Sequence, residues 1–428
     1  MTPRQSPTDT GRRCRPRALP DDGPRPSDQL AAFFLAGIAF LLAGAVSGIA
    51  WAVTGDDHLH WLALHLALLG GVSQLVLGAG QFFTCAFLAT APPSRRFAAA
   101  EIATWCAGTV LVGIGVPTGR SSLVDVGAAL IAAGLVLFAV ALRTMQRRSL
   151  QQARWAVRWY QACAAFLGIG ALVGVALARG AAWTHGSLLG AHLSLNLAGW
   201  MGTAIVGTLH TFFPSLTRTQ LRHPRLQGPT FVAWVSGVAL LATGAAWASV
   251  TLLACGWLAL LVAALMLASN IVGSLRGAPV LTLPARLVAL GQACLPAGLL
   301  LALATTVADG VYAPLAGAPR GALAVLLLAG WIGLTVAGSL LHLLAVLGRV
   351  RRRSATLPTP RPATDRLLVA AAGLGIAALA VSHSDGASGL HAPASILVLA
   401  VAAILAARIA TLLWQAVAPR RPARPDAG

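Results

Sequence analysis

Long apolar blocks separated by short polar segments run through almost the whole chain. A transmembrane α-helix needs about 20 apolar residues, and about twelve blocks reach or approach that length. The seventh and eleventh blocks are marginal in length. The pattern predicts an all-α, polytopic membrane protein whose spans are Leu30–Val53, Trp61–Thr90, Phe97–Val116, Leu123–Leu142, Ala156–Ala178, Ser187–Phe213, Phe231–Ala246, Val250–Ile271, Leu287–Val307, Gly321–Leu347, Leu367–Val381 and Ala394–Val417.

Composition excludes a soluble globular protein. Of 428 residues, 57% are hydrophobic and 10% are charged, whereas soluble domains carry about 25% charged residues. The net charge is +19, and every basic residue is an arginine. Because these arginines lie in tails and short loops between apolar blocks, they indicate topology signals and contacts with anionic lipid. We expect the lipid bilayer as a partner and no nucleic acid.

Charge placement predicts the orientation of the spans. Arginine groups precede the first block and follow each even-numbered block, while the alternate loops carry Asp56, Asp57, Asp309 and Asp385. By the positive-inside rule, both termini are expected to be cytoplasmic, which requires an even number of spans. We expect residues 1–28 to be a disordered cytoplasmic tail, 29–418 a twelve-helix transmembrane domain, and 419–428 a second cytoplasmic tail.

An internal repeat relates three of the blocks. Leu197–Leu209 in the sixth block and Leu328–Leu340 in the tenth are identical at seven of thirteen positions, at an offset of 131 residues (330 − 199 = 131). The second block gives a weaker copy, in which Gly70 and Gly78 match Gly199 and Gly207 at an offset of 129. The three copies lie four spans apart, which predicts three pseudo-repeated four-helix units. Close helix packing alone also selects for glycine, so the shared string is the stronger observation.

The repeat and its histidines resemble a known superfamily. Twelve spans, cytoplasmic termini and threefold four-helix repeats are similar to subunit I of the haem-copper oxidases. The strings from His65 to Gly71 and from His192 to Trp200 resemble segments of its outlying relatives. These relatives are the NnrS-like haem- and copper-containing membrane proteins and the membrane domains attached to some bacterial multicopper oxidases. The resemblance implies the bacterial cytoplasmic membrane, bound haem or copper, and a redox or copper-handling partner protein in respiration, nitrogen-oxide stress or copper handling.

The oxidase ligand set that this resemblance implies is incomplete here. The family places copper ligands in spans six and seven and two haem ligands in span ten. The seventh block has no histidine, and the tenth has only His342, at its cytoplasmic end. We therefore expect no complete oxidase centre, no catalytic residues and no oxidase activity.

Candidate ligands gather toward the outer face. Imidazole is the commonest nitrogen ligand of haem iron, copper and zinc. His65 precedes Gly70 by five positions and His192 precedes Gly199 by seven, so the repeat predicts similar depths, within about 3 Å, for the two rings. We predict that His65 and His192 bind haem or copper, assisted by His60 or His185. The alternative is that these histidines are interfacial residues that bind headgroups, water or neighbouring carbonyls.

Two other functions fit the same chain. A twelve-span bundle with repeats is also typical of membrane transporters, although those usually keep polar groups at mid-membrane. A ligand-free membrane scaffold or assembly factor is the third candidate. Absorption spectra and metal analysis distinguish the three.

Overall fold

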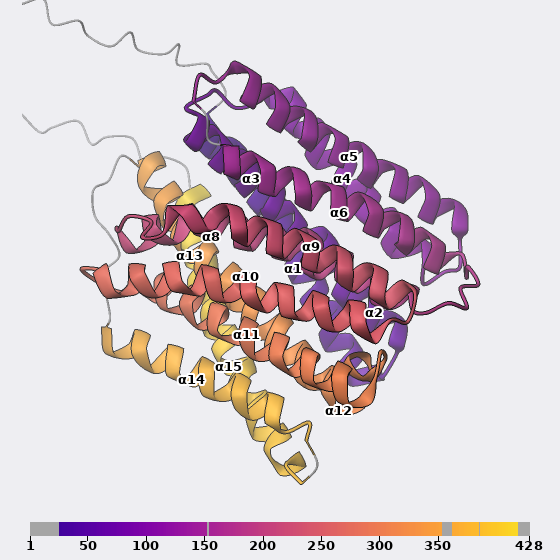
Figure 1. Cartoon of the computed structure of the whole chain (residues 1–428). Coiled ribbons are helices and arrows are strands. Elements are labelled where there is room, and N and C mark those ends of the chain that lie inside the picture. The colour runs from indigo at the N-terminus through magenta and orange to yellow at the C-terminus, as the bar shows by residue number, and fades with distance from the viewer. Residues whose placement is uncertain (1–24, 152–153, 353–361, 385, 418–428) are drawn as a thin grey trace, which may run out of the picture.

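The protein is a bundle of long helices. The computed structural model describes residues 25–151, 154–352, 362–384 and 386–417, and these ranges contain helices and no strand. Within them, eleven helices are long and apolar enough to cross a membrane. A twelfth, residues 188–217, carries polar groups such as His192 and Asn196. The prediction of an all-α polytopic membrane protein is therefore confirmed (Figure 1), and its apolar surface contacts the lipid bilayer.

The helices form three consecutive units of four spans each. Unit one contains α1 (Pro26–Thr54), α2 (Asp57–His65), η1 (Leu66–Val72), α3 (Ser73–Leu88), α4 (Arg95–Gly115) and α5 (Ser121–Arg148). Unit two contains α6 (Arg154–Ala178), α7 (Leu188–Leu193), η2 (Ser194–Gly202), α8 (Thr203–Thr217), η3 (Pro224–Leu226), α9 (Gln227–Ala246) and α10 (Val250–Gly277). Unit three contains α11 (Leu283–Asp309), η4 (Ala313–Leu315), α12 (Gly317–Ala324), η5 (Val325–Gly333), α13 (Leu334–Arg352), α14 (Pro362–Val381), η6 (Ser388–Leu390) and α15 (His391–Val417).

The two spans predicted to be marginal in length are longer in the structure. The seventh begins at Gln227, before the predicted Phe231, and the eleventh begins at Pro362, before the predicted Leu367. At the N-terminus, α1 begins at Pro26, inside the predicted tail. Residues 1–24 of the first predicted tail and all of the second, 419–428, lie outside the described residues.

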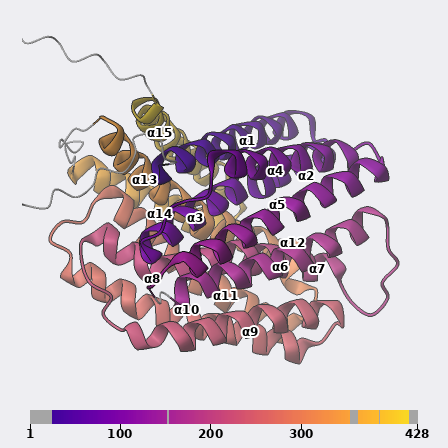
Figure 2. The same ribbon diagram turned by 90° about the horizontal axis from the view of Figure 1, so that it is seen from above.

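Contacts between helices repeat cyclically from unit to unit. In each unit the second span is one uninterrupted helix made of an α-helical, a π-helical and a second α-helical segment. These three spans, α2–η1–α3, α7–η2–α8 and α12–η5–α13, are called the inner helices. The first helix of each unit packs on its own inner helix, and the third and fourth helices pack together. Each inner helix also contacts the first helix of the next unit, through α3 with α6, α8 with α11 and α13 with α1. Helices of one unit stay together in Figures 1 and 2.

The three inner helices meet around a common axis. All three line one apolar cavity of about 90 Å³. Residues that face it from the first, second and third inner helices include Val76 and Ala79, Ile205 and Thr208, and Val336 and Ser339. The glycine-bearing repeat segments are therefore ringed about one axis, as the threefold repeat predicts. His65 and His192 do not line this cavity.

Each inner helix contains a π-helical segment at the repeated position. Ser194–Gly202 and Val325–Gly333 are offset by 131 residues (325 − 194 = 131), the offset of the sequence repeat, and Leu66–Val72 lies at the equivalent place in unit one. A π-segment holds an extra residue in the helical turn and is a common feature of functional sites. The repeat therefore extends from residue identity to backbone geometry.

Matched glycines let each inner helix approach the first helix of its own unit. A Cβ atom at Gly70 would lie 2.6 Å from the Phe40 ring, and one at Gly199 would lie 2.7 Å from Cβ of Phe166. At Gly330 it would lie 2.8 Å from Sγ of Cys294. The close-packing role of these glycines is confirmed.

The two ends of the bundle differ in chemistry. The end that holds the loops after α3, α5, α8 and α10, and both described chain ends, carries most of the arginines; we call it the arginine end. The opposite end holds the loops before α2, α7 and α15, with His58, His60, His185, His383 and His391; we call it the histidine end.

Candidate functional site

Two local helix starts place His65 and His192 near the histidine end. The Asp56 side chain accepts a hydrogen bond from the His58 backbone N–H and caps α2, whose last residue is His65. The Ser187 side chain accepts one from the Gly190 N–H and caps α7, which contains His192. Such caps satisfy amides that have no partner in the first helical turn. They fix where each helix begins and therefore how deep each histidine lies.

The structure brings the His65 and His192 rings together from different units. Their centroids are 6.5 Å apart and their planes are 25° from parallel. The Trp61 indole stacks on His65, with centroids 3.8 Å apart. Both histidines are partly buried. The two residues predicted as ligands are therefore neighbours in the structure.

Backbone carbonyls fix the tautomer of both rings. His65 Nδ1 lies 2.9 Å from the Trp61 carbonyl oxygen, and His192 Nδ1 lies 3.0 Å from that of Gly170. Because a carbonyl oxygen only accepts hydrogen bonds, these contacts favour the neutral tautomer that carries its proton on Nδ1. The lone pair of each Nε2 is then left to bind a ligand. Metal-binding histidines are oriented in this way by partners of the second ring nitrogen.

Asn196 holds the backbone of His192 from one turn further along the helix. Its Nδ2 donates to the His192 carbonyl oxygen at 2.7 Å and lies 3.2 Å from His192 Nδ1. On the facing helix, a Cβ atom at Gly174 would lie 2.9 Å from His192 Cε1. The ring therefore has little room to turn away from its present position.

The other predicted ligands lie elsewhere at the histidine end. His60 is exposed and stacks on Trp51 at 4.4 Å, and His185 is exposed and lies edge-on to Trp183 at 5.2 Å. Across the part of the chain that the structure describes, no three His, Cys, Asp or Glu side chains gather closely enough to hold a metal ion. The structure thus brings together His65 and His192 and leaves His60 and His185 apart from them.

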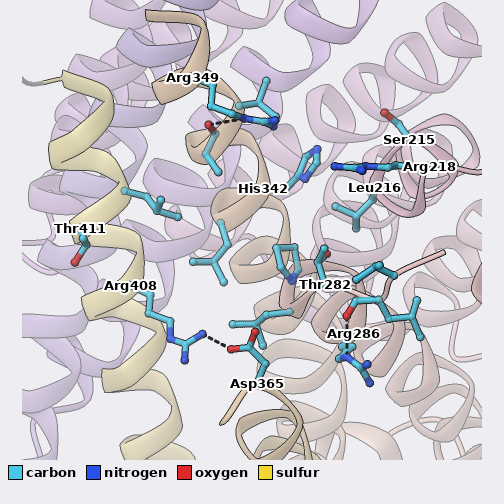
Figure 3. Close-up of a pocket in the computed structure, with 18 of the residues that line it drawn as sticks. Ser215, Leu216, Arg218, Thr282, Arg286, His342, Arg349, Asp365, Arg408 and Thr411 are labelled. Carbon is cyan, nitrogen blue, oxygen red and sulfur yellow. Dashed lines mark hydrogen bonds and ion pairs between the residues drawn. The ribbon is translucent and has the colours of Figure 1, made fainter. Parts of the chain in front are cut away.

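A second polar site, which the sequence did not predict, lies at the arginine end. A cavity of about 730 Å³ there is lined by the ends of α8, α11, α13, α14 and α15. Arg218, Arg286, Arg349 and Arg408 face it together with His342 and Asp365 (Figure 3). We call it the arginine cavity. Its arginines are far apart in sequence, so only the fold reveals that they converge.

A third polar group is buried inside unit one. Glu101 of α4 is 0% exposed, and both of its carboxylate oxygens accept from Nε2 of Gln81 on α3, at 3.0 and 3.1 Å. Ionisable groups within a membrane are costly and are usually retained for a function. The sequence shows Glu101 near the start of a span but does not reveal its partner.

Comparisons with known proteins identify no family for the chain. It matches no protein-family model. A search of curated proteins finds no match either.

Proposed function

We propose that this membrane protein binds a redox-active metal centre, copper or haem iron, between His65 and His192. The observation that carries the proposal is the meeting of two imidazoles from repeat-related helices, both with Nδ1 held by a carbonyl. The threefold ring of inner helices supports kinship with the haem-copper oxidase superfamily. The bacterial cytoplasmic membrane, with this site on its outer side, is the corresponding location.

The ring spacing fits two imidazoles that share one metal ion. Metal–nitrogen bonds of about 2.0–2.1 Å place the centroids of two opposed imidazoles about 6.3 Å apart when each ring centre lies about 1.1 Å behind its nitrogen. The observed separation is 6.5 Å. The separation of the rings therefore leaves room for one ion between them when both Nε2 atoms are turned toward it.

The number of protein ligands restricts the choice of centre. A tetrahedral zinc site needs three or four protein ligands, and the described residues supply no such group. Two imidazoles suffice for copper(I), which accepts two opposed nitrogen ligands, and for haem iron, whose other four ligands come from the porphyrin. Trp61 and the helix that carries Gly174 pack against the two histidine rings. This close packing favours the smaller centre, a single copper ion.

The residues around the site define its proposed role. His65 and His192 would hold the metal, and the Trp61 and Gly170 carbonyls would keep both rings in the ligating tautomer. Bound copper supplies one-electron redox chemistry or a step in copper transfer. A site near the membrane surface can exchange electrons or copper with a partner protein. We propose this carrier role in respiration, nitrogen-oxide stress or copper handling, in place of oxidase catalysis.

Metal analysis of the purified protein tests the proposal. Wild-type protein, expressed with added copper and haem precursor, should contain about one copper ion or show a Soret band. His65→Ala and His192→Ala should each lose the bound centre. His58→Ala, an exposed histidine at the same end, should retain it. Wild-type protein that binds neither copper nor haem would contradict the proposal. The transporter and scaffold functions would then be the remaining candidates.

A further inference from the structure

We propose that the arginine cavity is a binding site for a phosphate group that carries an apolar substituent. Its volume, about 730 Å³, lies in the range of small-molecule sites. Four guanidinium groups reach it from four separate elements: Arg218 at the end of α8, Arg286 on α11, Arg349 on α13 and Arg408 on α15. The site lies at the opposite end of the bundle from His65 and His192, so the inference is independent of the proposed metal centre.

The charges in the cavity are unbalanced. Asp365 is the only acidic residue among those that line it, and its Oδ1 accepts from Arg408 at 2.7 Å. For Arg218, Arg286 and Arg349, no ion pair forms with any acidic side chain in the described ranges. Like charges close together in a partly apolar cavity repel. An anion bound between the Arg218 and Arg349 guanidinium groups, which lie near each other in Figure 3, would reduce this repulsion.

Backbone carbonyls hold two of the arginine side chains in place. Arg286 and Arg349 each donate Nε–H to a backbone carbonyl, of Leu281 at 3.1 Å and Ala345 at 3.4 Å. These bonds orient the side chains and leave the terminal nitrogens of both guanidinium groups for a ligand. Planar guanidinium groups bind phosphate oxygens in pairs. In Figure 3, Arg218, His342 and Arg349 point toward one another across the cavity.

Two backbone features add to this arrangement. Helix α11 begins at the cavity, capped by Thr282, and a helix N-terminus favours an anion. Arg218 follows the last residue of α8 and has φ 56° and ψ 40°. This is a left-handed backbone conformation that residues other than glycine and asparagine seldom adopt. Such strain persists where the surroundings hold a residue in place, and it is concentrated at functional sites.

Much of the remaining wall of the cavity is apolar. Leu216, Leu283, Leu341 and Leu412 line it beside the arginines. The ligand is therefore expected to combine a phosphate group with a hydrocarbon or similarly apolar part. Two sources supply that chemistry: an anionic phospholipid that enters from the bilayer, and a soluble phosphoester that enters from the aqueous side.

The experiment measures binding to the purified full-length protein. Phosphatidylglycerol and phosphatidylcholine are titrated in parallel and followed by native mass spectrometry, and inorganic phosphate is titrated alone and followed by thermal stability. The cavity variant is Arg218→Gln/Arg349→Gln. The control is Arg147→Gln/Arg276→Gln, which removes the same charge from exposed arginines at the same end that do not line the cavity.

Wild-type protein should prefer phosphatidylglycerol over phosphatidylcholine, and the cavity variant should bind phosphatidylglycerol at least about tenfold more weakly, because two charge-assisted contacts are lost. The control should bind like wild type. A stabilising shift with inorganic phosphate alone identifies a soluble phosphoester as a ligand, and preference for phosphatidylglycerol without that shift identifies the lipid.

Two results would overturn the assignment. One is wild-type protein that neither distinguishes the two lipids nor responds to phosphate. The other is equal weakening in the control and cavity variants, which would show a general surface-charge effect. If the double variant aggregates, Arg349→Lys replaces it: this change keeps the charge but removes the paired guanidinium donors, so unchanged lipid preference in Arg349→Lys contradicts the proposal.

Discussion

At the scale of single residues, the polar groups in the apolar bundle are held by very few partners. The His192 ring has the Gly170 carbonyl, and the Glu101 carboxylate has the Gln81 amide. Water cannot replace a lost partner in such surroundings, so a buried group left alone costs far more than the hydrogen bond contributed. Substitutions next to these groups should therefore have large effects.

Gly174 gives a test of how tightly the His192 ring is positioned. Gly174→Ala places a Cβ 2.9 Å from His192 Cε1 and should displace the ring, whereas Gly168→Ala, on the same helix, places one 3.6 Å from the Leu135 side chain, an ordinary contact. We expect Gly174→Ala to lower bound copper or haem several-fold and Gly168→Ala to retain it. Equal metal content in both variants would show that the ring position does not control binding.

The Gln81–Glu101 pair is tested by a double-mutant cycle. Gln81→Leu leaves a buried carboxyl without its partner and should lower the free energy of unfolding by about 1–3 kcal/mol. Gln81→Leu/Glu101→Leu, which removes both polar groups, should recover part of this loss. The measurement is reversible unfolding in mixed micelles, with exposed Gln146→Leu as control. A double variant less stable than the Gln81 single variant would contradict this account.

At the scale of secondary-structure elements, tryptophan side chains support the π-segments. Carbonyls in a π-turn lose regular helical partners, and in a membrane they need others. Trp105 Nε1 donates to the Leu69 carbonyl at 2.9 Å, and Trp234 Nε1 donates to the Ala198 carbonyl at 3.2 Å. The two acceptors are repeat-equivalent (198 − 69 = 129). Unit three has no tryptophan on α14, and Trp331 instead donates to Gln292.

Removal of either indole N–H tests this support. Trp105→Phe and Trp234→Phe keep the aromatic bulk but lose the hydrogen bond, so each should destabilise the protein by about 1–3 kcal/mol. Trp414→Phe, at a side chain that is 74% exposed, should have little effect. Thermal unfolding in detergent is the measurement, and Trp105→Phe and Trp234→Phe variants as stable as Trp414→Phe would refute the explanation.

Helix positions were predictable at this scale, whereas backbone irregularities were not. The apolar blocks gave all twelve spans because each must be apolar over the thickness of the bilayer. A π-turn adds one residue without changing that pattern, so nothing in the Leu66–Val72 sequence distinguishes it from an α-helix. The seventh and eleventh spans are longer in the structure than predicted because their first residues are polar or proline. A hydropathy pattern leaves such residues out of a span.

At the scale of the whole molecule, the repeat predicted the threefold ring, and its offset identified which glycines correspond in the three units. It also placed His65 and His192 at similar depth on neighbouring helices. The arginine cavity was not predictable in this way. Arg218, Arg286, Arg349 and Arg408 occur in different loops and spans, and each alone looks like an ordinary topology signal.

The orientation of the whole bundle in the membrane can be tested directly. The arginine end should be cytoplasmic because arginines in short loops are retained there. A green fluorescent protein fused at the C-terminus should fluoresce, and alkaline phosphatase inserted in the loop between α6 and α7 should be active. The opposite pattern in both fusions would place His65 and His192 on the cytoplasmic side and invert the proposed access of both sites.

The three π-segments indicate how the bundle evolved. The same one-residue insertion at the same register in three helices is hard to acquire three times, because each insertion turns everything beyond it by about 100°. A single ancestral four-helix protein that already contained the irregular turn, followed by gene triplication and fusion, accounts for all three. The ancestor would then have assembled as a homotrimer, with the present axis as its symmetry axis.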